Sequence, residues 1–472
     1  MCNDFRYVTL FLSDPEFHGG NPPTPVHEPK SALLPDEQKA LVNASLSEPY
    51  SGPSTFSTVR AFMRREMKKD KFRRRTIFHT ICANDTGRMP APRLMQVRSY
   101  HILFSMTGRK KFGAGRDFKS FYHQFEFDPK VREILRYRYG DALFQLTRAA
   151  MGHKASAAAA HTTSKAIVLL ALHRARKTPS DVHYDIIIDD VLFMSDSLED
   201  LTAVCTAFDE ICSEIHATIG TFSPPTTLLT HRGVEFDFEK RLRRVKTSTI
   251  DRLRARFEYF SRSPTLPRLR SIIGAVMFCR TIMCIDVGDF LRAAIRAELT
   301  SQVPDPTIYR TTIDLVLAND WVHNVTTDTL PYGGTVVTDA TLTHWAAIFV
   351  DQQGEVITST GVVPEGPIHV SEALATLYAL DSLPSFDVPH RVEFVTDNTV
   401  WLFSMHRSYA RCDELQPIRS EFLGRLRLKN IFPVLAYIAS ADNPADNPSR
   451  GIEVDVGQLR RARSVAEFLQ AK

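Results

Sequence analysis

The chain lacks the features that mark secreted, zinc-module and membrane-spanning proteins. Its seven cysteines form no C-x-x-C pair, and their spacing fits neither a disulfide framework nor a zinc module. No uninterrupted apolar run approaches the roughly 18 residues of a membrane span. The first residues, MCNDFRYVTLFLSDPEF, lack the basic start and cleavage pattern of a secretory signal. We therefore expect a soluble protein of the reducing intracellular space, cytoplasmic or nuclear, with no membrane partner.

A strong excess of charge of either sign is also missing. The sequence has 58 basic and 54 acidic residues, which leaves a net charge of only +4. Any affinity for nucleic acid must therefore come from local basic clusters. Two such clusters are Arg64–Arg75 and Lys240–Arg256, and the first, RREMKKDKFRRR, has eight basic residues in twelve. Phosphate binding is one interpretation of the first cluster, and a solvated helix face or a nuclear-import signal are the others.

At 472 residues the chain is too long for one hydrophobic core, so several domains are expected. Strand and helix patterns alternate between residues 114 and 238, helical and basic patterns follow to about residue 325, and strand alternation returns after residue 330. Prolines break each candidate element in the first fifty residues. The predicted domains are a proline-rich arm at 1–60, an α+β domain at 61–239, a helical connection at 240–329 and a five-stranded α/β domain at 330–472.

The stretch IIIDDVLF, Ile186–Phe193, places two carboxylates between two apolar runs. This pattern predicts a β-hairpin with Asp189 and Asp190 at its turn. An Asp-Asp turn without glycine is not the preferred chemistry of a tight hairpin, so the pattern indicates a role beyond turn formation. Because aspartate is common in turns, a purely structural pair is the alternative.

A third aspartate, Asp117, ends a predicted strand, where aspartate is disfavoured. If this strand lies beside the Asp189 hairpin, the carboxylates converge, and divalent cations are then needed to neutralise them. Two Mg²⁺ ions about 3.5–4 Å apart, held by aspartates, activate an attacking hydroxyl and stabilise a leaving pyrophosphate. The three aspartates therefore predict a two-metal site for phosphoryl chemistry.

Four stretches, in this order along the chain, resemble motifs of retroelement reverse transcriptases. DFKSFY resembles their first catalytic motif, AAMGHKASAAAAH the small-residue motif that follows, and IIIDDVLF their aromatic-x-Asp-Asp hairpin. HRGVEFDFEKRL, which ends at Leu242, resembles the hairpin that contacts the primer terminus. Ile187 stands where the family usually has an aromatic residue, a departure that leaves the carboxylates unchanged. The resemblance implies a right-hand polymerase with fingers, a palm and a helical thumb or connection.

The resemblance also implies roles for individual residues. Asp117 and Asp189 would be metal ligands, and Asp190 a supporting carboxylate of the same metal site. Tyr122 would lie beneath the sugar of the incoming nucleotide and exclude a 2′-hydroxyl, with core packing as its alternative role. Gly152 and the alanines after it would let the backbone approach the template. The candidate contacts to triphosphate or template are the basic residues Arg73, Arg75 and Lys154.

Four more acidic residues follow in the last predicted domain: Asp339, Glu372, Asp397 and Asp446. Asp339 and Asp397 end predicted strands and Glu372 opens a predicted helix, so ordinary turn and helix-start roles are the alternative. Four acids at strand ends and helix starts of one sheet also fit a two-metal site that directs water at a phosphodiester. The second set of acids therefore also predicts a two-metal site.

The order Asp, Glu, Asp, Asp on five strands resembles ribonuclease H. TDATLTHWAAIFVD and NPADNPSRG resemble the tethered ribonuclease H of long-terminal-repeat retroelements, DIRS-like elements and pararetroviruses. Asp446, and not Asp442, matches the last ligand because it follows Asn443 in the N-x-A-D pattern. The lineage implied is a tyrosine-recombinase retroelement, DIRS-like or of the VIPER type. The expected fold is α+β and multidomain, a right-hand polymerase followed by a ribonuclease H-like α/β domain with a five-stranded mixed sheet.

The activity implied by both resemblances is RNA-directed DNA polymerisation with ribonuclease H cleavage of RNA in RNA/DNA hybrids. Two Mg²⁺ ions are expected in each site, with Mn²⁺ as a substitute. The expected partners are an RNA template, a DNA primer, deoxynucleoside triphosphates, the RNA/DNA hybrid and other retroelement proteins. The main alternative is a decayed or co-opted retroelement protein that binds nucleic acid without catalysis. A replicative DNA polymerase of another family is disfavoured because its Tyr-x-Asp-Thr-Asp pattern is absent from the sequence.

Overall fold

The computed structural model of the chain consists of two compact units. Unit 1 comprises Met1–Arg232 and Phe236–Lys240, and unit 2 comprises Gly233–Glu235 and Arg241–Lys472. The structure describes residues 8, 12–13, 33–52, 60–68, 71–79, 97–132, 135–302, 305–324, 330–407 and 409–454. The finer domain boundaries expected at residues 60 and 329 stay predictions.

Unit 1 is built mostly from antiparallel strands with two long helices. Its described helices are α3 (Pro35–Asn43), α5 (Tyr100–Thr107), η1 (Phe121–Gln124), α6 (Pro129–Arg132), α7 (Lys154–Arg174) and α8 (Leu198–Glu214). Its described strands are β1 (Ser47–Pro49), β2 (Arg60–Lys68), β3 (Lys71–His79), β4 (Phe112–Phe118), β5 (Arg136–Tyr139), β6 (Ala142–Leu146), β7 (His183–Ile187), β8 (Asp190–Ser195), β9 (Ile219–Thr226) and β10 (Leu228–His231). Strand β11 (Val234–Asp237) is divided between the two units.

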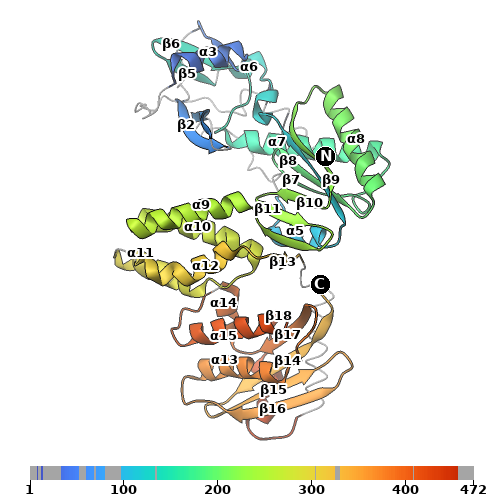
Figure 1. Ribbon diagram of the computed structural model, residues 1–472, viewed down its shortest axis with the longest axis vertical. Helices are drawn as coiled ribbons and strands as arrows, with labels where there is room; N and C mark the ends of the chain where they lie inside the picture. Colours follow the sequence, from blue (N-terminus) through green and yellow to red (C-terminus); the bar gives the residue numbers. More distant parts are fainter. Residues whose placement is uncertain are drawn as a thin grey trace. The chain divides into compact units, whose positions relative to one another are not determined.

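An antiparallel sheet of order β7-β8-β4-β9 is the centre of unit 1. Successive side chains in a strand point to opposite faces. Ala114, Phe118, Val191 and Phe193 lie on one face and share a buried core with residues of helices α7 and α8. Figure 1 shows both helices beside these strands. This apolar packing is the main stabilisation of the sheet, since burial removes hydrocarbon surface from water.

The opposite face of the same sheet carries acidic residues. The strand register places Asp117, Asp185 and Asp190 on this face. Arg116, one residue before Asp117, lies on the helical face, where its guanidinium donates hydrogen bonds of 2.7 and 2.8 Å to the carboxylate of Asp209 in α8. The helix-packed core and the acidic face are therefore the two sides of one sheet.

The expectation that prolines break every element in the first fifty residues is wrong for α3. Pro35 lies in the first turn of this helix, where proline is tolerated because the N–H that it lacks has no partner within the helix. Leu41 is buried, and Gln38 Oε1 accepts a 3.0 Å hydrogen bond from the hydroxyl of buried Tyr137. Residues of α3 therefore pack against β5 of unit 1.

The described residues of the basic stretch, 64–68 and 71–75, lie in two paired strands, so the interpretation of this stretch as a solvated helix face is wrong. Strands β2 and β3 pair antiparallel, with Arg64 opposite Arg75. Strand β3 continues into apolar residues, of which Phe78 is buried, and this anchored end favours an extended backbone over a helix. The side chains of residues 62–75 lie outside the described part of the structure, and their phosphate contacts stay predictions.

Unit 2 has a helical region, which follows strand β12 (Leu242–Val245), and then a mixed sheet. Its described helices are α9 (Thr247–Arg262), α10 (Leu266–Met283), α11 (Gly288–Thr300), η2 (Pro306–Tyr309), α12 (Arg310–Ala318), α13 (Ile368–Tyr378), η4 (Ala379–Ser382), α14 (Thr399–Arg407), α15 (Leu415–Leu428), η5 (Ser440–Asp442) and α16 (Asp446–Ser449). Its described strands are β12 (Leu242–Val245), β13 (Val322–His323), β14 (Tyr332–Ala340), β15 (His344–Val350), β16 (Val356–Val362), β17 (His390–Thr396) and β18 (Ile431–Tyr437).

The helical pattern predicted after residue 240 is confirmed by α9 to α12. Helix α9 buries Ile250, Leu253, Phe257 and Phe260, whose spacing of three to four residues forms one apolar face. Pro264 lies between α9 and α10, and another proline lies in the first turn of α10. Prolines therefore separate these helices, because proline interrupts the hydrogen bonding of a helix interior.

The five strands predicted after residue 330 are confirmed as one mixed sheet of order β16-β15-β14-β17-β18. Strand β14 pairs antiparallel with β15 and parallel with β17, which pairs parallel with β18. Helices α13 and α15 lie on the same side of this sheet (Figure 1) around a core that includes Val336, Phe394, Trp401 and Phe422. The parallel neighbours β14 and β17 bring their carboxyl ends to one edge, where α/β sheets commonly bind ligands.

Helix α7 is the described helix that is long and apolar enough, by length and composition alone, to cross a membrane. Most of that stretch is buried inside the protein. Ile167, Val168 and Ala171 belong to the core shared with the central sheet of unit 1. The buried core helix of a globular domain satisfies the same length and composition test.

Candidate active sites

The structure brings the backbones of the three aspartates of the first predicted site together. Asp117 of β4 lies directly opposite Asp190 of β8 in the antiparallel ladder. Directly opposed side chains share a face with Cβ atoms about 4.5–5.5 Å apart, and like charges at that spacing repel each other. The Phe118 N–H also donates a 3.1 Å hydrogen bond to the carbonyl oxygen of Asp189. The strand of Asp117 and the hairpin are therefore neighbours, as the sequence predicted.

The hairpin turn lies one residue earlier than the sequence predicted. Its two loop residues are Ile188 and Asp189, while Asp190 is already the first residue of β8. Ile188 has a φ of +60°, which is strained for a β-branched residue. Ser164 Oγ donates to the Ile188 carbonyl at 2.6 Å, and the Ile188 N–H donates to His161 Nδ1 at 3.4 Å. Strained backbone held by its surroundings is concentrated at functional sites.

A buried histidine, the first residue of the HRGVEFDFEKRL stretch, contacts one of these carboxylates. His231, the last residue of β10, is 2% exposed. Its Nδ1 lies 3.2 Å from Asp190 Oδ2, and its Nε2 lies 3.0 Å from Asp185 Oδ2. Burial alone lowers the pKa of His231, but the hydrogen bonds to two carboxylates outweigh burial and raise this pKa. The geometry suits an imidazolium that donates both of its N–H groups.

The second partner of His231, Asp185, belongs to a larger buried network. Arg232 Nη1 lies 3.3 Å from Asp185 Oδ2 and donates a 2.9 Å hydrogen bond to the carbonyl of Arg98. Burial raises the pKa of Asp185, but the hydrogen bond from His231 and the charge of Arg232 lower it. Their combined effect is larger, so the pKa of Asp185 lies below its usual value. The row Arg232, Asp185, His231, Asp190 alternates in charge and ties the Asp190 carboxylate to the sheet.

The remaining residues predicted for the first site are described to different extents. Tyr122 is partly buried in η1, and burial followed by the nearby Asp189 carboxylate raises the pKa of its phenol. Gly152 is exposed and precedes α7 with a φ of +112°, a conformation that favours glycine. The side chains outside the described part of the structure, whose roles stay predictions, are those of Arg73, Arg75 and Lys154.

The structure also gathers the four acids of the second predicted site. Asp339 is the next-to-last residue of β14, and Asp397 directly follows β17 at the same edge of the sheet. Glu372 lies in α13, which packs on β14, and Asp446 begins α16, which also contacts β14. Their charges interact: Asp397 and Asp446 act on Asp339, and Asp397 and Asp339 act on Glu372. One sheet edge therefore concentrates negative charge.

Burial and mutual repulsion raise two pKa values in this acid cluster. Burial, followed by repulsion from Asp397 and Asp446, raises the pKa of Asp339 to about 6, although a hydrogen bond from Ser449 lowers it. Burial, followed by repulsion from Asp397 and Asp339, raises the pKa of Glu372 to about 7. A divalent cation would relieve this repulsion, and carboxylate oxygens are the protein ligands that Mg²⁺ prefers. The donor set therefore fits the expected metal.

Hydrogen bonds already orient two of these acids. Ser449 Oγ donates a 2.6 Å hydrogen bond to Asp339 Oδ2. Arg450 donates two hydrogen bonds, of 2.8 and 3.1 Å, to Asp446 Oδ1. A cation bound at Asp446 would share that carboxylate with a guanidinium, whereas Asp339 receives a neutral donor. Asp339 is therefore the better oriented of the two for metal binding.

Replacing Glu372 with Gln is expected to stabilise the protein at pH 8 in the absence of divalent cations. The folded-state pKa of about 7 lies above the reference value of 4.5, so the Glu372 carboxylate costs stability progressively as the pH rises from about 4.5 to about 7. Each kcal/mol gained corresponds to about 2–4 °C in Tm for a unit of this size. Thermal unfolding at pH 5 and pH 8 measures the effect, which should be small at pH 5.

The matched control for this prediction is Glu365→Gln, which removes an exposed carboxylate seven residues earlier in the chain, before α13 begins. Its Tm should equal that of the wild type at both pH values. Mg²⁺ should stabilise the wild type at pH 8 more than the Glu372→Gln variant. The cation relieves the repulsion between carboxylates, which the mutation has already reduced. Equal Tm values for all three proteins at pH 8 would contradict the crowding of acids at this edge.

Comparison with solved structures shows that the chain has a reverse-transcriptase-like fold. It matches a foamy viral protease-reverse transcriptase in complex with double-stranded DNA at a TM-score of 0.53 and 14% identity, covering 89% of this chain and 85% of that chain. The foamy viral protease-reverse transcriptase in complex with RNA/DNA hybrid gives 0.54 and 13%, over 89% of this chain and 55% of that chain, so this chain spans about half of that one. No protein-family model and no curated protein matches the chain.

Proposed function

We propose that the protein is an RNA-directed DNA polymerase that also cleaves RNA in RNA/DNA hybrids. The observation that carries the proposal is the register of β4 and β8, which sets Asp117 opposite Asp190 with Asp189 in the adjoining turn. Opposed carboxylates on one face are unfavourable without cations, and two Mg²⁺ ions are the usual solution at sites of nucleotidyl transfer. Mn²⁺ is the expected substitute.

In this proposal the three aspartates have different roles. Asp117 and Asp189 would hold the metal ions, which when bound lower the pKa of the primer hydroxyl and stabilise the charge on the leaving pyrophosphate. Asp190 shares a hydrogen bond with buried His231, so part of its charge is already balanced by the protein. Asp190 therefore suits a supporting role that positions the turn, in agreement with the role that the resemblance implies.

We assign the second activity to the acid cluster of unit 2. Asp339, Glu372, Asp397 and Asp446 would hold two metal ions, which when bound direct water at the RNA phosphodiester. Glu372 would bind as the ionised carboxylate, and because its pKa without metal is raised to about 7, metal binding near neutral pH would release a proton. Tethering of this cluster to the polymerase site in one chain would let hybrid RNA be removed after it has been copied.

The proposed partners follow from this pair of activities. They are an RNA template, a DNA primer, deoxynucleoside triphosphates and the RNA/DNA hybrid, bound through phosphate contacts that weaken with salt. Support comes from the solved relatives, which hold double-stranded DNA or an RNA/DNA hybrid. The layout of fingers, palm and helical thumb, the contribution of other retroelement proteins, the intracellular location, and the DIRS-like or VIPER lineage belong to the same proposal.

The test is primer extension by the purified full chain on an RNA template with a labelled DNA primer. Extension with deoxynucleotides and Mg²⁺, and its loss with EDTA, is the expected result. Shortening of a labelled RNA strand within a hybrid is the second readout. If the chain binds the hybrid but neither extends the primer nor cleaves the RNA with Mg²⁺ or Mn²⁺, the non-catalytic binding protein is the correct alternative.

Replacing Tyr122 with Ala is expected to let the polymerase incorporate ribonucleotides. The ring lies near Asp189, where the proposal puts the sugar of the incoming nucleotide, and removing it opens space for a 2′-hydroxyl. Single steric contacts change discrimination by roughly 10- to 200-fold. The ratio of kcat/KM for a ribonucleotide to kcat/KM for its deoxynucleotide, measured in single-nucleotide extension, should therefore rise by about this factor relative to the wild type.

Tyr122→Phe is the matched control because it keeps the ring and loses the hydroxyl alone. Its preference for deoxynucleotides should remain that of the wild type. An unchanged preference in the Tyr122→Ala variant would leave core packing as the role of this residue.

A further inference from the structure

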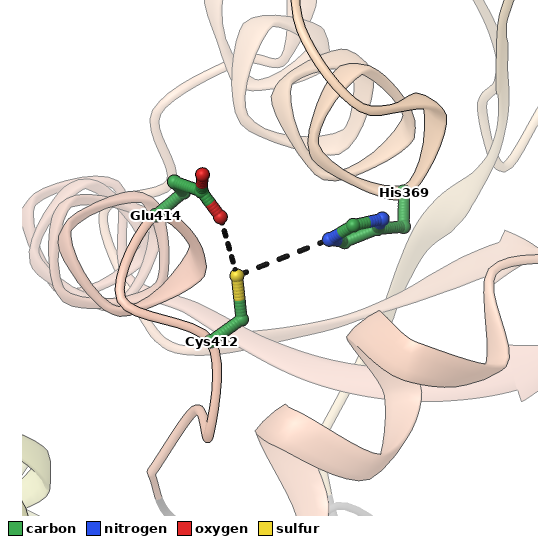
Figure 2. Close-up of side chains that lie close together, drawn as sticks. All are labelled: His369, Cys412 and Glu414. Carbon is green, nitrogen blue, oxygen red and sulfur yellow. Dashed lines mark hydrogen bonds between the residues drawn. The ribbon is translucent and has the colours of Figure 1, made fainter.

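A second kind of donor cluster lies in unit 2, with sulfur and nitrogen atoms in place of carboxylates alone. His369 is in the first turn of α13, and Cys412 and Glu414 precede α15 (Figure 2). The Cys412 thiol donates to Glu414 Oε2 at 2.7 Å, and its Sγ lies 3.9 Å from His369 Nε2. The three donor atoms lie within 4.8 Å of one another. Three ligand types that bind transition metals therefore converge from two elements.

Neighbouring contacts hold both parts of this cluster in position. Asn398 Nδ2 donates a 2.8 Å hydrogen bond to the carbonyl of His369. The segment before α15 is held by an ion pair between Asp413 and Arg292 of α11, and by a 2.9 Å hydrogen bond from the Ala410 N–H to Gln416 Oε1. The backbone that presents the donors is thus anchored on both sides, so binding would require mainly side-chain rotation.

We propose that His369, Cys412 and Glu414 bind a Zn²⁺ ion. Zinc takes sulfur at about 2.3 Å and nitrogen or oxygen at about 2.0–2.2 Å, so tetrahedral donors lie roughly 3.3–3.6 Å apart. The observed separations of 3.9 and 2.7 Å lie on either side of this range. Glu414 is exposed, so its carboxylate is free of packing that would prevent it from moving outward.

The chemistry of binding balances without another reactant. Zn²⁺ replaces the thiol proton: the S–H bond breaks, the Zn–S bond forms and the proton passes to solvent. One thiolate and one carboxylate neutralise the charge of the ion, and water fills the fourth position. Thiolate sulfur favours zinc over magnesium, whereas the acid cluster offers oxygen ligands alone. The two sites therefore select different cations, and the zinc site stands independently of the proposed catalytic function.

The test is titration of the purified full chain with Co²⁺, a spectroscopic substitute for zinc, followed by displacement with Zn²⁺. A thiolate-to-cobalt charge-transfer band that saturates at one equivalent and disappears on addition of zinc is the expected result. The band should be lost in Cys412→Ser, and the affinity for cobalt should fall at least tenfold in His369→Gln and in Glu414→Gln. Circular dichroism of each variant checks that it is folded.

Two matched variants distinguish this site from other cysteines and acids. Cys284→Ser removes an exposed thiol elsewhere in unit 2, and Asp397→Asn weakens the acid cluster. Both should retain the wild-type band. A wild type without the band, or a folded Cys412→Ser variant that keeps it, would overturn the proposal.

Discussion

Replacing Asp189 with Asn is expected to reduce primer extension by roughly three orders of magnitude, equivalent to about 4 kcal/mol of transition-state stabilisation. The substitution keeps the size of the side chain and the loop position of the residue between β7 and β8. It removes one negative charge from the turn next to Asp117 and Asp190. A site with one charge fewer holds divalent cations less well, and the chemical step depends on them. Single-turnover extension on an RNA template measures the loss.

Affinity for nucleic acid should survive this substitution, because loss of a carboxylate next to phosphates removes repulsion. Asp141→Asn, in an exposed turn, is the control for loss of one charge and should extend normally. Asp397→Asn should show the reverse pattern, with normal extension and lost hybrid cleavage. An Asp189→Asn protein that extends primers at the wild-type rate would exclude this site as the polymerase centre.

Replacing His231 with Leu is expected to destabilise the protein by about 3 kcal/mol. Removing one member of a buried charged network leaves buried charges uncompensated, and this histidine contacts both Asp185 and Asp190. The expected cost is at the lower end of the range for buried pairs because Arg232 still contacts Asp185. Extension should fall as well, since the Asp190 carboxylate loses the contact that positions it. Denaturant unfolding gives the stability, and extension at saturating substrate gives the rate.

His216→Gln is the matched control, because His216 is exposed and precedes β9 of the same unit. Its stability should equal that of the wild type. The double variant Asp185→Asn/His231→Gln should be more stable than His231→Leu, because it removes both charges and keeps hydrogen-bonding groups. Equal destabilisation by His231→Leu and His216→Gln would mean that the network contributes nothing.

The stability supplied by His231 should depend on pH in a defined direction. Its folded-state pKa is raised above the reference value of 6.5, so the contribution is fully present below about pH 6.5 and is lost as the pH rises through the raised value. Asp185 behaves in the opposite way, because its lowered pKa makes its contribution disappear as the pH falls through that value. The difference in stability between wild type and His231→Gln should therefore be largest in mildly acidic solution.

Much of the fold was predictable from the sequence because the relevant patterns are local. Alternation of apolar residues predicted the five strands after residue 330, and spacing of three to four residues predicted the helices between Thr247 and Ala318. The errors were local too. The proline pattern predicts a break where Pro35 begins a helix, and the charge pattern of Arg64–Arg75 allows a helix where β2 and β3 pair as strands. Charge density alone does not distinguish a helix from a strand.

The candidate carboxylates could be identified from the sequence because acids at strand ends and turns conflict with local preference. Asp117 at a strand end and the Asp189-Asp190 pair without glycine both broke ordinary rules, and such conflicts are concentrated at functional sites. His231 begins the HRGVEFDFEKRL stretch but conflicts with no local preference, so the sequence gives it no role of its own. A lone histidine at the end of a strand fits many roles, and its two carboxylate partners are 41 and 46 residues away in sequence.

The sequence by itself therefore determined which residues are acidic, the order of most strands and helices, and the order of the two acid clusters along the chain. Tertiary structure decided the pairing of Asp117 with Asp190 and placed the turn one residue earlier than predicted. It also decided the burial that raises the pKa of Glu372 to about 7 and the proximity of His369 to Cys412. The physical reason is the distance along the chain over which each effect acts. Propensity acts over a few residues, whereas charge repulsion, burial and metal-ligand convergence depend on distances that long-range strand pairing and helix packing set.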